Sequence, residues 1–339
     1  MSITNDRTFM RLALREARRG VGLTSPNPAV GAVIVKAGRV ISRGWHRGAG
    51  LPHAEVEAIR SLKDRADAKG ATIYVTLEPC CTHGRTPPCT EAIVAAGFRR
   101  VVFGATDPNP DHAGRAVGIL TKAGLRVTHR ILAEECTELN AGFNHWVTTG
   151  MPLVIAKAGL SLDGRLTRPP GEGQWLTSEA SRRDAMKLRA SVDAILIGAG
   201  TLRADNPRLT LRGVKGRQPL RAVLTRSGSL PEGAHLFTDE HKDLTLVYRG
   251  KSLRAVLRDL GKRGCTSVLI EGGGELLGGA FDAKLVQRAV IYLAPILCGG
   301  PDVIKGIGAA KSGLAARIVA PEYRRCGPDL LIRGSIASN

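Results

Sequence analysis

The chain has 339 residues, of which 43% are hydrophobic and 23% charged, and its mean hydropathy is -0.04. These values exclude an intrinsically disordered chain, and the length exceeds the usual size of one hydrophobic core, so we expect two globular domains. The sequence contains no run of about 18 apolar residues, which argues against a membrane-spanning helix.

Charge and cysteine content bear on the cell compartment and on the class of partner. The 49 Lys and Arg against 30 Asp and Glu give a formal charge of +19, yet these cations are spread along the chain and aromatic residues make up only 4%. A nucleic-acid surface would gather cations beside stacking aromatics, so we interpret the charge as a solvated basic surface and expect no nucleic-acid or membrane partner. Residues 1–19 lack the apolar segment of a signal peptide and the cysteines number seven, so we expect reduced thiols in the cytoplasm.

The first half of the chain alternates between helical and strand patterns. Small and apolar residues predict a helix over 8–20. Further on, strands are predicted over 30–35, 39–45, 71–77 and 100–105, and helices over 54–62 and 90–96. This alternation is typical of an α/β layer fold.

Residues 140–152 break the rhythm, because the run AGFNHWVTTGMP combines Gly, Pro and small polar residues. We place the domain junction there, between a first domain of residues 1–146 and a second of residues 151–339. Short β-prone runs with helical or loop material between them predict strands over 153–158, 194–198, 221–225, 244–248, 267–270, 289–294 and 330–332. The second domain is therefore also expected to be α/β.

Metal-ligating residue types gather in the first half. A His-Ala-Glu triplet spans His53 to Glu55, and Pro-Cys pairs end at Cys80 and at Cys89. One imidazole and two thiolates suit zinc, and three protein ligands leave a fourth position for water. An H-x-E triplet followed by Pro-Cys is the signature of zinc deaminases, in which the Glu is not a ligand but moves protons. We therefore predict His53, Cys80 and Cys89 as ligands and Glu55 as catalytic acid and base, with a purely structural zinc or ordinary core cysteines as the alternative.

The residues around these ligands bear on thiol chemistry and on family. Both cysteines follow Pro, a residue suited to helix starts, so we expect both thiolates near helix N-termini that lower their pKa. Nucleoside and RNA-editing deaminases place only two residues between the cysteines. The longer stretch EPCCTHGRTPPC at 78–89 resembles instead the bifunctional deaminase-reductase family of riboflavin biosynthesis. That resemblance implies a cytidine-deaminase-like three-layer domain.

The resemblance also assigns residues near the metal. It implies the same three ligands and leaves Cys81 and His83 off the metal. Relatives often carry Ser in place of Cys81 and His in place of Thr82, so this chain departs from the family pattern beside its ligands. Asn27, in the Pro-rich turn SPNPAVG, offers a donor and an acceptor for a pyrimidine edge. The resemblance makes Asn27 a substrate contact, and a turn-stabilising Asn is the alternative.

Gly-rich turns follow two predicted strands of the second half, at 198–200 and 272–274. Glycine there lets the backbone approach a phosphate, which the amides of the next helix start can bind. Neither turn is a G-x-G-x-x-G that opens a first βα unit, so each alone is a weak signal. Together and in this order they resemble the reductase domain of the same family, whose fold is like dihydrofolate reductase.

This second resemblance implies binding sites for NADPH and for a phosphorylated pyrimidine. The residues that would line the NADPH site are Gly159, Trp175, Thr201, Asp205, Gly273 and Gly274. Those that would face the ribosyl-phosphate substrate are Arg189, Leu209, Arg212 and Glu271, and guanidinium groups suit a phosphate. Lys157 is the candidate for orienting or polarising the reacting end, with a strand-end surface lysine as the alternative. Gly173 stands where relatives often have a Ser before the Gln-Trp pair, so one hydroxyl contact is missing or supplied elsewhere.

These signals together predict a two-site enzyme with Zn2+ and NADPH as cofactors. It would deaminate 2,5-diamino-6-(5-phosphoribosylamino)pyrimidin-4(3H)-one and then reduce the ribosyl side chain to ribityl, and we expect a homo-oligomer. One alternative is a tRNA or nucleoside deaminase with an appended RNA-binding domain, which the basic charge favours. Another is a zinc-stabilised scaffold that binds nucleic acid, which leaves Glu55 and the Gly-rich turns without a role.

Overall fold

The computed structural model describes residues 3–83, 87–110, 112–166, 175–226, 228–298 and 315–337. The chain divides into two compact units, Met1–Thr149 and Gly150–Asn339, called here the first and the second unit and described separately. Across these described ranges, no helix combines the length and apolar character needed to cross a membrane.

The first unit is built on a five-stranded sheet in the order β2-β1-β3-β4-β5. β1 pairs antiparallel with β2 and β3, whereas β3, β4 and β5 run parallel. Every residue of β3 is buried, including both threonines. The strands are β1 (Gly31–Lys36), β2 (Arg39–Trp45), β3 (Thr72–Leu77), β4 (Arg100–Ala105) and β5 (Arg126–Thr128).

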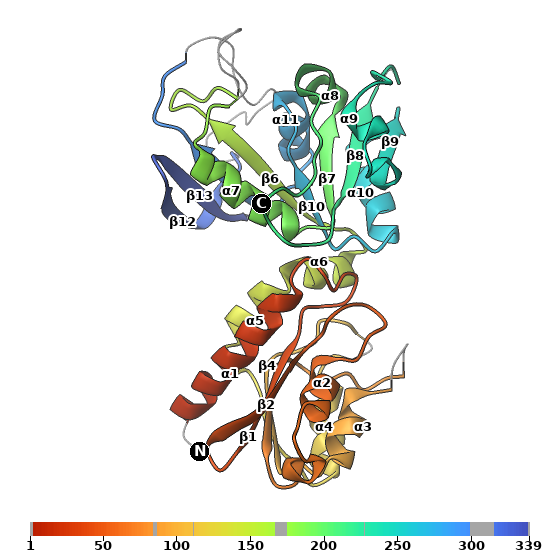
Figure 1. The fold of residues 1–339 in the computed structure, drawn as a ribbon, viewed down its shortest axis with the longest axis vertical. Helices are drawn as coiled ribbons and strands as arrows, with labels where there is room; N and C mark the ends of the chain where they lie inside the picture. Colours follow the sequence, from red (N-terminus) through yellow and green to blue (C-terminus); the bar gives the residue numbers. More distant parts are fainter. Residues whose placement is uncertain are drawn as a thin grey trace. The chain divides into compact units, whose positions relative to one another are not determined.

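Helices cover both faces of this sheet, with α1 and α5 on one face and α2, α3 and α4 on the other (Figure 1). Two glycines permit the close packing. A Cβ on Gly31 would lie 2.1 Å from the carbonyl oxygen of Ala13 in α1, and one on Gly44 would lie 2.3 Å from the amide nitrogen of Ala58 in α2. The helices are α1 (Ile3–Ala17), α2 (Ala54–Arg60), α3 (Cys89–Ala95), α4 (Arg115–Lys122), α5 (Ala133–Leu139) and α6 (Ala141–Thr149), with 3-10 turns η1 (Arg18–Gly20) and η2 (Arg65–Ala68).

The second unit contains an eight-stranded sheet in the order β12-β13-β11-β6-β10-β7-β8-β9. From β11 to β9 the neighbours run parallel, and β13 pairs antiparallel with β11 and β12. The strands are β6 (Leu153–Leu160), β7 (Ala194–Gly198), β8 (Leu220–Thr225), β9 (Thr245–Arg249), β10 (Ser267–Ile270), β11 (Arg288–Leu293), β12 (Ile318–Cys326) and β13 (Asp329–Ile336). The helices are α7 (Glu179–Ala190), α8 (Ala199–Asp205), α9 (His235–Thr238), α10 (Leu253–Lys262) and α11 (Gly274–Asp282), with the 3-10 turn η3 (Lys242–Leu244).

Each predicted strand and helix is present, and the α/β character of both units is confirmed. The expectation of an irregular segment over 140–152 is wrong where α6 forms. A single Gly within a helix is tolerated, and Asn140 fixes the chain ahead of α6 by bonding both backbone groups of Ala29, 111 residues away. Sequence patterns also missed α4, α5, β5 and β12. β12 is an edge strand with mostly exposed residues, so it carries no buried apolar alternation.

Candidate zinc and NADPH sites

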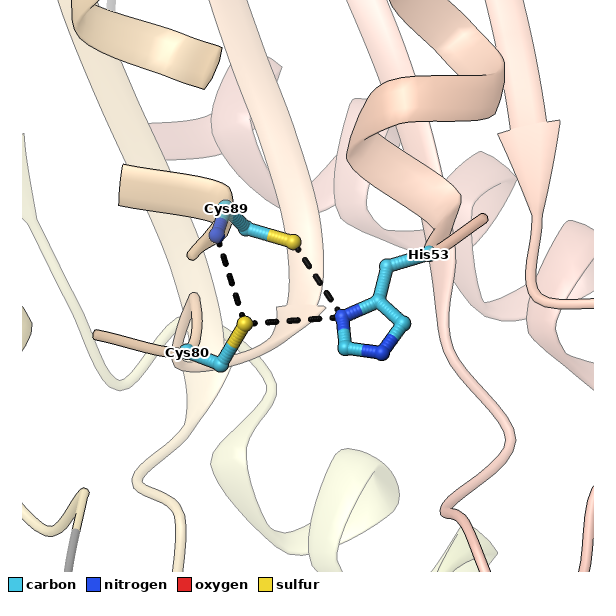
Figure 2. Close-up of side chains that lie close together, drawn as sticks. All are labelled: His53, Cys80 and Cys89. Carbon is cyan, nitrogen blue, oxygen red and sulfur yellow. Dashed lines mark hydrogen bonds between the residues drawn. The ribbon is translucent and has the colours of Figure 1, made fainter. Parts of the chain in front are cut away.

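The first unit brings the three predicted zinc ligands together. Nδ1 of His53 lies 3.2 Å from Sγ of Cys89 and 3.5 Å from Sγ of Cys80, and Figure 2 shows the ring nitrogen facing both sulfurs. Tetrahedral zinc, with bonds of about 2.3 Å to sulfur and about 2.0 Å to nitrogen, separates such atoms by about 3.5 Å. In the part of the chain that the structure describes, this is the one His, Cys, Asp or Glu group placed to hold a metal ion.

Helix starts position two of the three ligands. His53 is the residue before α2, and Cys89 is the first residue of α3, directly after Pro88. Cys80 has no helix of its own, which corrects the expectation of a helix start at each cysteine. Its sulfur instead accepts a hydrogen bond of 3.3 Å from the backbone N–H of Cys89. Both sulfurs therefore lie at the N-terminus of α3, because the loop after Cys80 brings Cys89 next to the Cys80 sulfur.

The pKa values of the two thiols shift in opposite directions, so the expected lowering holds for Cys80 and is wrong for Cys89. A hydrogen bond from the Cys89 thiol lowers the pKa of Cys80 to about 4, against burial that would raise it, and His53 adds to the lowering. Hydrogen bonding to Cys80 and burial raise the pKa of Cys89. The first proton is thus lost from Cys80, and the second must be displaced when a cation binds.

Glu55 lies in the first turn of α2, two residues after the ligand His53, and is buried. Burial raises its pKa to about 7, although the charge of His53 opposes the increase. A carboxyl group with a pKa near neutrality can both accept and return a proton at physiological pH. The position and pKa of Glu55 therefore suit the proton transfers predicted for it.

The second unit holds a cavity of about 700 Å³. It lies where the neighbouring parallel strands β6, β10 and β7 lead into their following loops and helices, the usual place for a ligand in an open α/β sheet. All eleven residues predicted for the reductase site line this cavity: Lys157, Gly159, Trp175, Arg189, Thr201, Asp205, Leu209, Arg212, Glu271, Gly273 and Gly274. The structure thus brings together residues that the sequence spreads over more than a hundred positions.

A buried ion pair lies in the wall of the cavity. The Glu271 carboxylate accepts hydrogen bonds from Arg189, at 2.7 Å from Nε and 3.0 Å from Nη2, and Nζ of Lys157 lies 3.7 Å away. Burial alone would raise the pKa of Glu271, but the charges of Arg189 and Lys157 outweigh it and lower the pKa to about 2. Glu271 is therefore ionised at neutral pH.

The contacts of Arg189 and Lys157 bear on the roles predicted for them. The Arg189 guanidinium is occupied by Glu271 and by the carbonyl of Thr210, at 3.3 Å from Nη1, so it does not offer a free fork to a phosphate. Lys157 lies inside β6 with a side chain only 22% exposed and its Nζ 6.0 Å from the ring centre of Tyr292. The alternative interpretation of Lys157 as a strand-end surface lysine is therefore wrong.

Three residues predicted to bind NADPH, Thr201, Gly159 and Trp175, have further contacts in the cavity wall. The Thr201 hydroxyl accepts a hydrogen bond of 3.0 Å from the Gly273 amide and so joins the starts of α8 and α11. A Cβ on Gly159 would lie 3.1 Å from the Thr177 methyl group, a contact tighter than ordinary packing. Trp175 is 48% exposed, with Arg182 stacked 5.5 Å from its ring centre. Gly173 lies outside the described residues.

Two family models match the chain. The cytidine and deoxycytidylate deaminase zinc-binding region matches residues 3–105, and the RibD C-terminal domain matches residues 152–332, more than half of the chain. The chain belongs to the RibD family.

Relatives and solved structures agree over nearly the full length. The riboflavin biosynthesis protein RibD of Bacillus amyloliquefaciens is 39% identical, over 95% of this chain and 94% of the relative. The RibD protein of Mycobacterium tuberculosis is 40% identical, over 95% of both chains. Among solved structures, Acinetobacter baumannii RibD is 35% identical with a TM-score of 0.90, covering 99% of this chain and 100% of that one. A Thermotoga maritima structure, described as a diaminohydroxyphosphoribosylaminopyrimidine deaminase and 5-amino-6-(5-phosphoribosylamino)uracil reductase, is 32% identical over 99% of both chains with a TM-score of 0.90.

As a RibD protein, this chain is a bifunctional deaminase and reductase of riboflavin biosynthesis. The first unit is its cytidine-deaminase-like zinc domain and the second its reductase domain, with zinc and NADPH as cofactors and a small pyrimidine as substrate. The alternative of an appended RNA-binding domain is wrong, because the second half matches a reductase domain. A nucleic-acid-binding scaffold is set aside for the same reason.

The structure places His46, which the sequence analysis did not single out, close to the zinc ligands. His46 is buried, and its Nε2 lies 3.1 Å from Nδ2 of Asn27, while its Nδ1 lies 3.0 Å from the Pro52 carbonyl. Its ring meets that of His53 edge-on, with centres 5.1 Å apart. Burial lowers the pKa of His46. The neutral ring thus donates to Pro52 and accepts from the Asn27 amide, which fixes the orientation of Asn27.

Glu78 and His112 also escaped sequence reasoning. The buried Glu78 carboxylate accepts hydrogen bonds of 3.0 Å from the amides of Gly114 and Ala116, and so docks the start of α4 beside the ligand loop. Nδ1 of His112 lies 3.4 Å from Oγ1 of Thr82, in the loop between the two ligand cysteines. Glu78 directly precedes the Pro79-Cys80 pair, and this position is a sequence signal for a role near the metal. No sequence motif marks His112 or His46.

Proposed function

We propose that the first unit deaminates 2,5-diamino-6-(5-phosphoribosylamino)pyrimidin-4(3H)-one and that the second unit reduces the ribosyl side chain of the product with NADPH. The zinc part rests on one observation, the convergence of Nδ1 of His53 and two cysteine sulfurs beside the buried Glu55. The Thermotoga maritima relative, whose description names this pair of activities, supports the substrate assignment.

In the deamination, His53, Cys80 and Cys89 would hold zinc, which would supply Lewis-acid activation of water. Glu55 would accept a proton from the attacking water and return a proton to the departing amino group, so that a C–O bond forms at the amino-bearing ring carbon, its C–N bond breaks and ammonia leaves. Asn27, whose amide nitrogen is held by His46, offers its carbonyl oxygen to an N–H group on the pyrimidine edge.

In the reduction, bound NADPH would supply the hydride that C1′ of the ring-opened ribosyl group accepts. The adjacent heteroatom gains electron density and needs a proton or a cation nearby. Lys157 is our candidate for that role, because its ammonium lies in the cavity beside the ionised Glu271. Arg212, exposed at the cavity, is the better phosphate contact, since Arg189 is occupied by Glu271.

The test is a two-step incubation of the purified protein with the diamino pyrimidine phosphate. Ammonia should appear without NADPH, and NADPH should be oxidised only after the deaminated product has formed. NADPH oxidation without prior ammonia release would contradict the proposed order, and an inert substrate would overturn the assignment. A homo-oligomer, a cytoplasmic location and the lack of a nucleic-acid partner remain predictions, to be checked by native mass measurement, localisation and RNA titration at varied salt.

A further inference from the structure

A second buried ion pair in the reductase unit lies behind the cavity wall. The Arg221 side chain, on β8, is 1% exposed, and Asp239, just after α9, is 8% exposed. The guanidinium binds both oxygens of Asp239, at 2.6 Å from Nη1 and 2.8 Å from Nη2. Neither residue lines the cavity, and no motif in the sequence marks either one.

The same guanidinium holds two backbone carbonyls. Nη1 donates to the carbonyl of Arg208 at 3.0 Å, and Nη2 donates to that of Leu236 at 3.1 Å. Arg208 directly precedes Leu209, which lines the cavity, is 3% exposed and has a φ of +53°. A leucine rarely adopts this left-handed backbone conformation, and surrounding contacts must maintain it.

The other flank of Leu209 is also held by a buried arginine. The carbonyl of Thr210 accepts a hydrogen bond from Arg189, the partner of Glu271, and the amide of Leu211 donates to the Gln218 side chain at 2.9 Å. Hydrogen bonds from two arginines thus bracket one strained residue. Arg189 also binds the ionised Glu271 carboxylate, so it links the backbone beside Leu209 to the cavity.

We infer that Arg221 and Asp239 are positioning residues of the reductase site, which hold the backbone of residues 208–210 so that Leu209 presents its side chain to the pyrimidine substrate. This inference rests on the proposed function and on the predicted substrate contact of Leu209, which lines the cavity. Asp239 fixes the orientation of the Arg221 guanidinium, and Arg221 holds the backbone next to Leu209 through the carbonyl of Arg208.

Stability alone does not account for this arrangement. A buried ion pair is costly to desolvate, and apolar residues of similar volume often stabilise a fold equally well. The guanidinium fork, however, binds one carboxylate and two carbonyls from two separate segments at once, which neither Lys nor an apolar side chain can do. Its distinctive contribution is geometric, and its effect should therefore appear in substrate binding.

The experiment compares Arg221→Lys and Arg221→Met with the wild type and with Leu260→Ala. Leu260 is fully buried in α10 and lies outside the cavity lining, so its truncation lowers stability without touching the wall. We expect both Arg221 variants to raise the KM for the deaminated pyrimidine substrate about tenfold or more. Ammonia release and the NADPH dissociation constant should stay within about twofold of wild type, as should the KM of Leu260→Ala.

Thermal unfolding of every variant separates positioning from folding. If Arg221→Met does not fold, Arg221→Lys and Asp239→Asn, which keep similar volumes, serve as the test. An unchanged KM in folded Arg221→Lys and Asp239→Asn, with unfolding temperatures lowered as in Leu260→Ala, would make the pair merely structural. A wild-type protein that does not oxidise NADPH with the deaminated substrate would instead overturn the proposed function.

Discussion

Replacing Glu271 by Gln should destabilise the second unit in a strongly pH-dependent way. Lowering a carboxyl pKa from 4.5 to about 2 corresponds to about 3 kcal/mol of folding free energy, since one pKa unit is worth about 1.4 kcal/mol. Because the folded-state pKa is the lower one, this stabilisation is fully present above about pH 4.5 and is lost as the pH falls towards 2. The variant also leaves Arg189 buried without its counter-charge, and losses of about 3–5 kcal/mol are typical of such broken pairs.

The assay is urea unfolding followed by the fluorescence of Trp175, in a background that carries Trp45→Phe and Trp146→Phe. Trp175 is the one tryptophan of the second unit, so it reports on that unit. The difference in unfolding free energy between the wild type and Glu271→Gln should be about 3 kcal/mol at pH 7 and should shrink towards zero near pH 2. Glu275→Gln, an exposed change in the first turn of α11, should alter stability by less than about 0.5 kcal/mol. A wild-type advantage that stays constant from pH 7 to pH 3 would refute the ion-pair argument.

Three further predictions concern the first unit. Glu55→Gln should retain about one zinc ion per chain by elemental analysis but lower ammonia release by about a hundredfold or more, because it removes the proton carrier; near-normal release would exclude Glu55 from the proton transfers. Chelation of zinc, or Cys89→Ser, should abolish ammonia release, and added zinc should restore it only in the chelated wild type. NADPH oxidation with the deaminated substrate should persist in both, and its loss on chelation would contradict separate sites. Gly31→Ala should destabilise the first unit by about 1–3 kcal/mol or more, because the new methyl group would lie 2.1 Å from the Ala13 carbonyl oxygen; an unchanged unfolding temperature would show that α1 moves away freely.

Asn27 and Glu271 show which parts of the site could be predicted from sequence. The resemblance assigns both; Asn27 lies beside His46 and Glu271 lines the reductase cavity, and their roles remain predictions. Their partners could not be inferred, because His46 is 19 residues from Asn27 and Arg189 is 82 residues from Glu271. The occupied guanidinium of Arg189 changes its expected role, and only side-chain packing reveals that.

The sequence by itself determined the α/β class, most of the strands, the first three helices, the zinc ligand set and the family, because these depend on local apolar periodicity and on closely spaced motif residues. Only the tertiary structure decided that α6 is helical, that β12 forms an edge strand, and that Arg221 lies behind Leu209. Such features depend on hydrogen bonds and ion pairs between distant segments, and local periodicity contains no information about which distant residues will meet.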